Sequence, residues 1–382
     1  MIAADVYRNE ELVGHLAKSE GGIVEFRYLE SAKSPVATTL PLDGGPYIGV
    51  AGALPAFFTN LLPEGRRLSA LKRQVKASLD DELALLIAVG ADTIGDVQVI
   101  PHGEEPIGAP AMIDLGGELD FSKALSDSGI PDPVAVPGVQ DKASARIIAA
   151  PVAGAGNEFI LKVSPPEFPK LVENEAACFD IARGTGFPLA ETQLLHDVHG
   201  RPGLLVTRFD REGKRRLHME DAAQIMGLYP SAKYDPPMED VVEALKSVSA
   251  SPVLTARSVA FQVALAWLTG NGDLHAKNVS LIWHNGAAEP APIYDIPSTV
   301  PYGDTTMALE LQGRNDNISA KIFRAFCAEI GLPQRAAERV MELALKTTED
   351  APERIINATE FDPRRVRDLR RILDRRRRLW LG

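Results

Sequence analysis

The part of the sequence richest in chemically useful side chains is the segment 270–278, Gly-Asn-Gly-Asp-Leu-His-Ala-Lys-Asn. It offers a carboxylate, an imidazole, an ammonium group and two side-chain amides. The residues before it, 255–268, have apolar positions at helical spacing and lead to a glycine, whereas residues 279–283 form an apolar run typical of a short buried strand. A polar loop held at both ends by regular elements is a common place for a functional site.

The order of these polar residues indicates phosphoryl transfer. Asp273 and Asn278 have the interval D-x-x-x-x-N of a protein-kinase catalytic loop, in which the aspartate accepts the proton of the attacking hydroxyl and the asparagine oxygen holds magnesium. The interval alone also fits an ordinary solvated turn between a helix and a strand. Asp295, at the end of another apolar run, is available as a second carboxylate for the metal.

The motif N-G-D-x-H-x-K-N and the pair Tyr294-Asp295 resemble those of the HipA family of serine/threonine kinases, the toxins of bacterial two-gene toxin–antitoxin modules. Further blocks extend this resemblance over nearly the whole chain. It implies an α+β, two-lobed protein-kinase-like fold with an N-terminal β-rich subdomain and a mostly α-helical C-lobe. It also implies ATP and magnesium as cofactors, with Asp273 as the catalytic base, Asn278 and Asp295 as magnesium ligands, and His275, Lys277 and Tyr294 at the nucleotide, where His275 mainly braces the loop.

A lysine in an apolar strand is the next candidate. Lys162 lies in the strand predicted over 158–163, and a lysine there must either reach the edge of the sheet or meet a charge. The family has I-x-K at this place, so the resemblance implies that Lys162 contacts the ATP phosphates and takes part in catalysis. Glu175, in the helix that follows, matches an N-E pair of the family and could orient Lys162, with a solvated helix face as the alternative.

A glycine-containing loop at 137–144 precedes a predicted strand. Alone it fits a simple hairpin turn, because it has one glycine and is not a G-x-G-x-x-G. It resembles the A-G-x-Q-x-K loop that covers the phosphates in the family, where backbone amides can approach phosphate oxygens. The resemblance therefore assigns phosphate contacts to Gly138, Val139, Gln140 and Lys142.

The segment 203–211 is predicted to be a strand that ends in charged residues. In the resemblance, Thr207, Arg208 and Phe209 align with the linker that joins kinase lobes and binds adenine through backbone hydrogen bonds and an apolar ring contact. Packing at the edge of a sheet is the alternative interpretation.

The chain is long enough for two or three structural units. We expect a β-rich N-terminal subdomain over 1–105, which begins with two or three antiparallel strands and is followed at 101–110 by a proline- and glycine-rich connection. A kinase N-lobe over 106–206 and a helical C-lobe over 207–382 complete the chain. In the family the first unit carries no catalytic residue, so a packing role is expected for Asn60, Pro63 and Glu64.

Composition limits the possible partners and compartments. The net charge of −11 argues against general affinity for nucleic acids or anionic membranes. Cys178 and Cys327 are the only cysteines, which fits reduced thiols and not a disulfide framework. No stretch resembles a signal peptide or a membrane span, so we expect a cytoplasmic protein without a membrane partner.

Basic residues are concentrated near the C-terminus, where nine arginines lie between 364 and 378. Apolar residues at 366, 369, 373 and 380 share one helical stripe, so the arginines are expected to cover the other faces. A solvated helix is one interpretation, and a supplementary phosphate contact on DNA is the other. The resemblance implies a HipB-like helix-turn-helix antitoxin as partner, with operator DNA contacted indirectly through that complex.

The function implied by the resemblance is an ATP- and magnesium-dependent protein kinase toxin. In the family the protein substrates are aminoacyl-tRNA synthetases, whose phosphorylation stops translation; the sequence does not say which protein is phosphorylated here. A nucleotide-binding pseudokinase that acts through its antitoxin and DNA is an alternative, although Lys162, Asp273, Asn278 and Asp295 are all intact. A kinase for a small molecule is a third possibility, because the same loop geometry serves such enzymes.

One position departs from the family. HipA toxins commonly have a serine just before the phosphate loop whose autophosphorylation inactivates the kinase, and Ala135 stands there in this chain. Alanine cannot accept a phosphate, and Pro137 restricts the loop and lacks an N–H donor. We expect this switch to be missing, with Ser144 as the nearest substitute acceptor.

Overall fold

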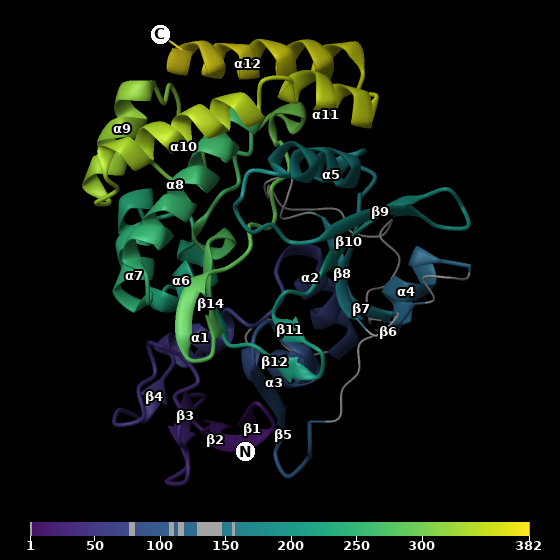
Figure 1. Cartoon of the computed structure of the whole chain (residues 1–382). Helices are drawn as coiled ribbons and strands as arrows, with labels where there is room; N and C mark the ends of the chain where they lie inside the picture. The colour runs from purple at the N-terminus through teal and green to yellow at the C-terminus, as the bar shows by residue number, and fades with distance from the viewer. Residues whose placement is uncertain are drawn as a thin grey trace.

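The computed structural model describes residues 2–75, 81–106, 111–113, 118–127, 147–154 and 157–381. Two five-stranded sheets and a largely helical carboxyl-terminal part make up the described chain (Figure 1). The α+β, two-lobed architecture predicted from the sequence is confirmed.

The first sheet forms a unit of residues 2–101, called here the amino-terminal unit. Its strand order is β4-β3-β2-β1-β5, and all neighbouring strands are antiparallel. The strands are β1 (Ile2–Arg8), β2 (Glu11–Lys18), β3 (Val24–Tyr28), β4 (Tyr47–Ile48) and β5 (Val97–Pro101). The helices are α1 (Ala56–Thr59), α2 (Gly65–Val75) and α3 (Glu82–Val89). Leu16, Phe26 and Phe58 are buried between the sheet and the helices, so the unit has a hydrophobic core of its own.

The second sheet has the order β6-β7-β8-β10-β9 and is antiparallel except for the β6–β7 pair. Its strands are β6 (Ala111–Met112), β7 (Ile148–Gly154), β8 (Asn157–Val163), β9 (Thr192–His196) and β10 (Pro202–Thr207). Helix α4 is Phe121–Asp127, and α5 is Leu171–Ala182. The side chain of Asn174 on α5 exchanges two hydrogen bonds with the backbone of Ser298, of 2.7 and 3.0 Å, which fix α5 against the chain beyond Asp295.

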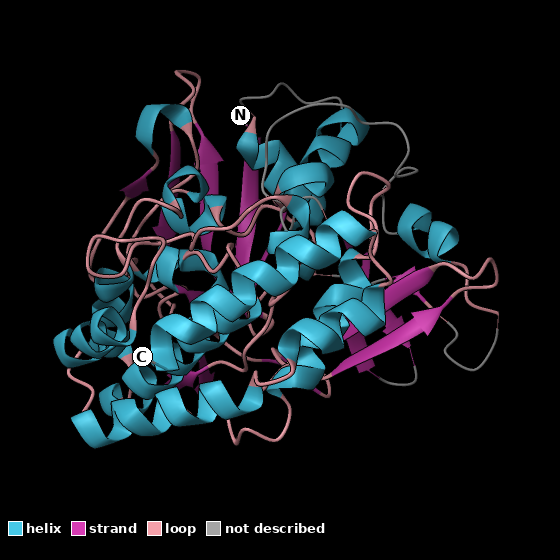
Figure 2. Ribbon diagram, turned by 90° about the horizontal axis from the view of Figure 1, so that it is seen from above, coloured by secondary structure: helices cyan, strands magenta, loops and turns pink. Residues whose placement is uncertain are grey.

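The carboxyl-terminal part is mostly helical (Figure 2). Its helices are α6 (Ala222–Ile225), α7 (Met238–Val248), α8 (Pro252–Thr269), α9 (Ala320–Glu329), α10 (Gln334–Thr347), α11 (Ala351–Thr359) and α12 (Pro363–Leu381). A small sheet contains β13 (Met219–Asp221), β14 (Ser280–His284) and β15 (Ala287–Pro290), and β11 (Arg211–Glu212) pairs with β12 (Arg215–Arg216). Helix α8 is buried on all sides from Ser258 onward, because its neighbours there are themselves apolar.

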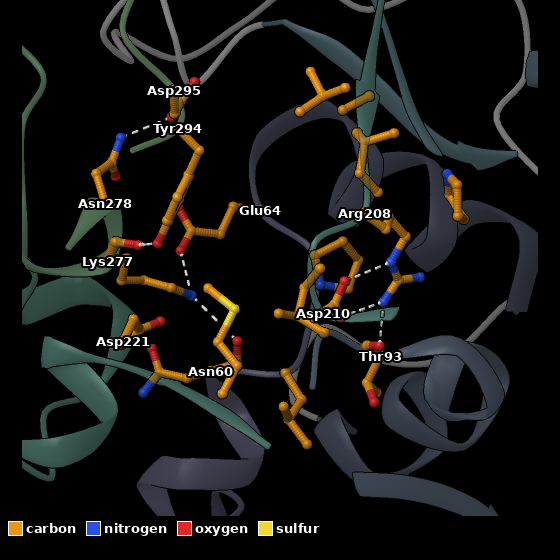
Figure 3. Close-up of a pocket in the computed structure, with 18 of the residues that line it drawn as sticks. Asn60, Glu64, Thr93, Arg208, Asp210, Asp221, Lys277, Asn278, Tyr294 and Asp295 are labelled. Carbon is orange, nitrogen blue, oxygen red and sulfur yellow. Dashed lines mark hydrogen bonds and ion pairs between the residues drawn. The ribbon is translucent and has the colours of Figure 1, made fainter. Parts of the chain in front are cut away.

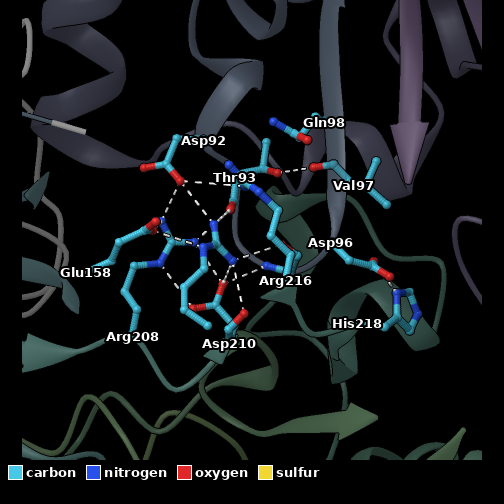
Figure 4. Close-up of polar contacts among 12 residues, drawn as sticks. Asp92, Thr93, Asp96, Val97, Gln98, Glu158, Arg208, Asp210, Arg216 and His218 are labelled. Carbon is cyan, nitrogen blue, oxygen red and sulfur yellow. Dashed lines mark hydrogen bonds and ion pairs between the residues drawn. The ribbon is translucent and has the colours of Figure 1, made fainter. Parts of the chain in front are cut away.

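Two buried polar clusters join the amino-terminal unit to the rest of the molecule (Figure 4). In the first, the Arg208 guanidinium donates to Asp92, Asp210 and the carbonyl of Thr93, and Arg211 reaches the same groups. Because every member is hydrogen-bonded in a buried setting, this network fixes the end of β10 against the amino-terminal unit.

The second cluster is centred on His218, which lies between two carboxylates. Its Nδ1 is 2.7 Å from Asp96 of the amino-terminal unit, and its Nε2 is 3.0 Å from Glu220 of β13. Glu220 in turn accepts hydrogen bonds from the backbone and the hydroxyl of Thr38. Burial alone would lower the pKa of His218, but the two carboxylates outweigh it and hold the pKa above its ordinary value.

Three further features agree with or refine the expectations from the sequence. Cys178 on α5 and Cys327 on α9 are buried and form no disulfide. No helix in the described ranges is long and apolar enough to cross a membrane. On α12 one arginine departs from the expected solvated pattern, because Arg376 is buried, stacks on the Trp267 ring and donates to the carbonyls of Trp267 and Thr305.

Candidate active site

The polar loop 270–278 is held in a single conformation at the end of α8. Gly270 terminates the helix with a φ of 80°, and a side chain there would come within 3.0 Å of Val300, Ser298 and Leu373. Only glycine combines that backbone conformation with so close a neighbour. The Thr299 hydroxyl then accepts the N–H of Gly272 at 2.8 Å, so the loop is fixed before it reaches Asp273.

Asp273 faces the pocket from this loop and is 2% exposed. Its backbone N–H donates to the Asn271 side chain at 2.8 Å, and its Oδ1 accepts the hydroxyl of Tyr234 at 2.8 Å. A carboxylate fixed in this way is oriented before any substrate arrives. Burial and the nearby Asp273 carboxylate raise the pKa of Tyr234, so this hydroxyl remains a donor.

Lys162 lies where two carboxylates meet. Its Nζ is 2.6 Å from Glu175 Oε1 on α5 and 2.9 Å from Asp295 Oδ1. Asn278 donates from Nδ2 to Asp295 Oδ2 at 2.7 Å. Strand β8, helix α5, the loop 270–278 and the segment after β15 therefore bring together four residues that are far apart in the sequence. The sequence left open whether Glu175 orients Lys162 or lies on a solvated helix face. In the structure Glu175 forms a direct ion pair with Lys162.

The charges of Lys162 and Asp295 stabilise each other, whereas burial raises the pKa of Glu175 above its ordinary value. Burial would lower the pKa of Lys162 and raise that of Asp295, but the ion pair outweighs burial in both groups, so the lysine stays protonated and the aspartate ionised. Asp295 also has a φ of 56°, in the left-handed region that is strained for a residue other than glycine. Backbone strain at a buried charge is typical of a functional position.

The donor set suits a hard divalent cation beside a nucleotide. Asp295 and Asn278 offer carboxylate and amide oxygens, the atoms that magnesium prefers, and they lie next to a lysine suited to phosphate oxygens. The surrounding pocket has a volume of about 390 Å³, within the range of small-ligand sites. These residues therefore fit magnesium and ATP.

Thr207, Arg208 and Phe209, the predicted adenine-binding linker, line the pocket. The backbone N–H groups of Thr207 and Arg208 and the Arg208 guanidinium, however, already have partners within the protein. The N–H groups of Thr207 and Arg208 donate to the carbonyls of Glu191 and Glu158, and the Arg208 guanidinium is held in the buried network with Asp92 and Asp210. The Arg208 side chain thus has a structural role in the described chain. The Phe209 ring, 5.7 Å from the Tyr294 ring, is the group placed for an apolar contact.

The remaining predicted residues of the loop region have distinct environments. His275 packs edge-on against the Tyr234 ring, and burial followed by the charge of Lys233 lowers its pKa to about 3, so it is a neutral ring at neutral pH. Tyr294 donates its hydroxyl to the Lys277 carbonyl at 2.6 Å. Lys277 directs its ammonium group toward the amino-terminal unit, where it is 2.8 Å from Glu64 Oε1 (Figure 3).

Sequence reasoning missed several pocket residues. Glu64 was expected only to pack, whereas it enters the pocket, and Lys233 and Asp221, which also line it, were given no chemical role. Tyr234, whose hydroxyl donates to Asp273, was given none either. Burial, which outweighs the attraction of Lys277, raises the pKa of Asp221 to about 7. The sequence shows that these side chains are charged or polar, but only the fold brings them together at one pocket. The expected packing role of Asn60 agrees with its hydrogen bond to the Leu228 carbonyl at 2.7 Å.

The predicted phosphate loop lies outside the described residues. This applies to Gly138, Val139, Gln140 and Lys142, and also to Ala135, Pro137 and Ser144. Their assigned roles remain predictions.

The fold and this cluster define a kinase: a lysine on a sheet strand paired with a helix glutamate, facing an aspartate–asparagine loop and a second aspartate. Comparison with protein families agrees. The HipA-like C-terminal domain matches residues 134–352, and the HipA N-terminal domain matches residues 4–100. The chain belongs to the HipA family.

Individual relatives extend over most of the chain. It is 28% identical to the protein Y4mE of Sinorhizobium fredii, with 93% of this chain and 92% of that protein aligned. It is 29% identical to the serine/threonine-protein kinase toxin HipA of Shewanella oneidensis over 78% of this chain and 76% of that protein. The solved structure of the Shewanella HipA, HipB and operator DNA complex matches with a TM-score of 0.76 at 23% identity, covering 99% of this chain and 97% of that one.

Proposed function

We propose that this protein is an ATP- and magnesium-dependent serine/threonine protein kinase that acts as the toxin of a HipBA-like toxin–antitoxin module. The observation that carries the proposal is the contact of Lys162 with both Glu175 and Asp295, because a kinase must have the lysine–glutamate pair and the metal-binding aspartate in place together. A retired kinase would not need to maintain this buried arrangement.

In the proposed reaction the side chains act mainly by position and charge. Lys162 binds phosphate oxygens and is kept in place by Glu175. Asn278 and Asp295 would hold magnesium, which would offset the negative charge of the phosphates. Asp273 orients the hydroxyl of the acceptor and receives its proton, and Tyr234 keeps the Asp273 carboxylate in one orientation.

The proposal extends to partners and compartment. The Shewanella relative was solved with HipB and operator DNA, which supports a helix-turn-helix antitoxin as partner of this chain and DNA contact through their complex. The family resemblance points to an aminoacyl-tRNA synthetase as the protein substrate, so that phosphorylation inhibits translation and promotes persistence in the cytoplasm. The proposed limits of the N-terminal subdomain, N-lobe and C-lobe remain 1–105, 106–206 and 207–382.

Incubation with γ-labelled ATP, magnesium and a cell lysate tests the proposal. We expect a labelled protein band that is absent when the Asp273→Asn variant replaces the unaltered protein. Label recovered only in a small metabolite would identify a small-molecule kinase instead. Nucleotide binding without any transfer, together with tighter operator binding in the antitoxin complex, would identify a pseudokinase that acts as a co-repressor.

A further inference from the structure

A carboxylate of the amino-terminal unit enters the pocket and meets two lysines. Glu64 lies in the turn between α1 and α2, and its Oε1 is 2.8 Å from Lys277 Nζ. Its Oε2 forms an ion pair with Lys233 Nζ. Lys277 also donates to the carbonyl of Asn60 at 3.2 Å. All four residues line the pocket that contains Asp273 and Asn278. Figure 3 shows Asn60, Glu64 and Lys277 together at this place.

These contacts differ from ordinary surface ion pairs. The side chains of Lys233 and Lys277 are 9% and 12% exposed, and a single carboxylate serves both ammonium groups. Burial would raise the pKa of Glu64, but the two lysines outweigh it and lower the pKa to about 2, so the carboxylate is ionised throughout the physiological range. Removing one member would leave a confined charge without its partner, which is costly.

Each of the two lysines is attached to the catalytic loop by a second contact. Lys277 belongs to the loop, and its carbonyl accepts the hydroxyl of Tyr294, the neighbour of Asp295. The carbonyl of Lys233 accepts the N–H of Ala276 at 3.2 Å. Lys233 also precedes Tyr234, whose ring it approaches at 5.2 Å and whose hydroxyl is bonded to Asp273. A shift of either lysine would therefore displace the neighbours of the Asp273 and Asp295 carboxylates.

We propose that Glu64 is a positioning residue for phosphotransfer: it holds Lys233 and Lys277 against the catalytic loop, so that the amino-terminal unit completes the active site. This inference rests on the proposed kinase function. It assigns Glu64 a role beyond packing, and it explains why a unit with its own core sends one ionised side chain into the pocket of another part of the chain.

The effects of Glu64→Gln on kcat and on ATP affinity distinguish a positioning role of Glu64 from a role in general stability of the fold. Glu64→Gln keeps the shape of the side chain but frees both ammonium groups, so we expect kcat to fall about 10- to 100-fold, the effect of a small displacement at a reacting centre. Affinity for ATP, an anion, should be unchanged or higher, because the pocket becomes more positive. Collapse of the pocket would weaken ATP binding as well.

The experiment measures kcat and the Kd for ATP in five variants, with melting temperatures recorded for each: Glu64→Gln, Glu64→Asp, Lys277→Met, the Glu64→Gln/Lys277→Met double variant and Glu82→Gln. Glu64→Asp retains the charge and should recover most of the lost kcat. Glu64→Gln in a Lys277→Met background should cost much less than in the unaltered protein, because residues that act through one contact are not additive. Glu82→Gln is the matched control: Glu82 accepts from Leu54 N and Thr59 within the amino-terminal unit, so it should change the melting temperature and leave the ratio of kcat to ATP affinity alone.

Normal kcat in Glu64→Gln, weakened ATP binding in that variant, or full additivity with Lys277→Met would each overturn the inference. Failure of the proposed function has a different signature, namely no phosphotransfer by the unaltered protein, and the inference then falls with it. If the unaltered protein does transfer phosphate, the kinase function stands and the results for the variants bear on Glu64 alone.

Discussion

At the scale of single residues, the two acidic side chains of the site have separable tasks. We expect Asp273→Asn to abolish phosphotransfer and to change the affinity for ATP by no more than a few-fold, because the proposed role of Asp273 is to orient the acceptor hydroxyl and not to bind ATP. Asp295→Asn should also weaken binding of magnesium-ATP, because Asp295 contacts both Lys162 and Asn278. Calorimetric titration with ATP, with and without magnesium, checks the difference; near-normal transfer by Asp273→Asn would refute the assignment.

Tyr234 offers a milder test of the same carboxylate. Tyr234→Phe keeps the ring against His275 and removes the hydroxyl that donates to Asp273. Loss of one hydrogen bond to a buried charged group is worth about 1.5–3 kcal/mol, so kcat should fall by roughly one to two orders of magnitude. Tyr7→Phe in the amino-terminal unit, which loses an exposed hydroxyl contact with the Glu104 carbonyl, is the control, and steady-state kinetics on both variants decide the matter.

Residue spacing predicted part of this site and could not predict the rest. The interval between Asp273 and Asn278 indicated a catalytic loop because one short segment carries both groups. The pairing of Lys162 with Glu175 stayed open, since the rotation of a helix relative to a neighbouring strand depends on packing and not on local pattern. Glu64 could not be placed at all, because its partners Lys233 and Lys277 lie far from it in the sequence and meet it only in the folded chain.

At the scale of elements, the boundaries of α8 and β14 were predicted closely, because both segments are strongly apolar and end in a glycine or a polar loop. The faces of α12 were less predictable. Arg376 shares the buried face with Leu369 and Leu373, and its long side chain finds two carbonyl acceptors there. Charge alone suggested a solvated position for it.

Arg376 therefore connects α12 to the end of α8. Burial lowers its pKa to about 10, yet the group remains charged at neutral pH. Arg376→Met would leave the buried carbonyl of Trp267 and the half-buried carbonyl of Thr305 without this donor, and we expect a loss of about 2–4 kcal/mol in the free energy of unfolding. Arg371→Met, an exposed change on the same helix, should stay within about 0.5 kcal/mol. Urea denaturation of both variants makes the comparison.

The His218 cluster predicts how pH acts on the contact between the amino-terminal unit and β13. Because the folded pKa of His218 lies above its ordinary value of 6.5, its stabilising contribution is complete below about pH 6.5 and is lost as pH rises through the folded pKa. The melting temperature of the unaltered protein should therefore exceed that of His218→Gln most clearly near pH 6, and the gap should narrow toward pH 9. A gap independent of pH would contradict a protonated His218.

At the scale of the whole molecule, the arginines of α12 divide into those that hold the fold and those that face solvent. Arg364, Arg367 and Arg378 are exposed. If the proposed antitoxin complex places α12 beside operator DNA, changing these three to glutamine should flatten the dependence of operator affinity on salt, by up to about one power of the salt concentration per lost phosphate contact. Arg335→Gln and Arg339→Gln on α10 serve as the control, and an unchanged slope would leave α12 as ordinary surface.

The two buried cysteines can report on local opening of the molecule. Burial raises the pKa of both thiols to about 12, so neither is a thiolate at neutral pH and neither reacts unless its surroundings open. Cys178 lies on α5, one turn from Glu175, whereas Cys327 lies on α9, another helix of the same hydrophobic core. The rate at which a thiol reagent modifies Cys178 therefore measures how often α5, which carries the Lys162 partner Glu175, separates from its neighbours. The rate for Cys327 measures how often α9 does so.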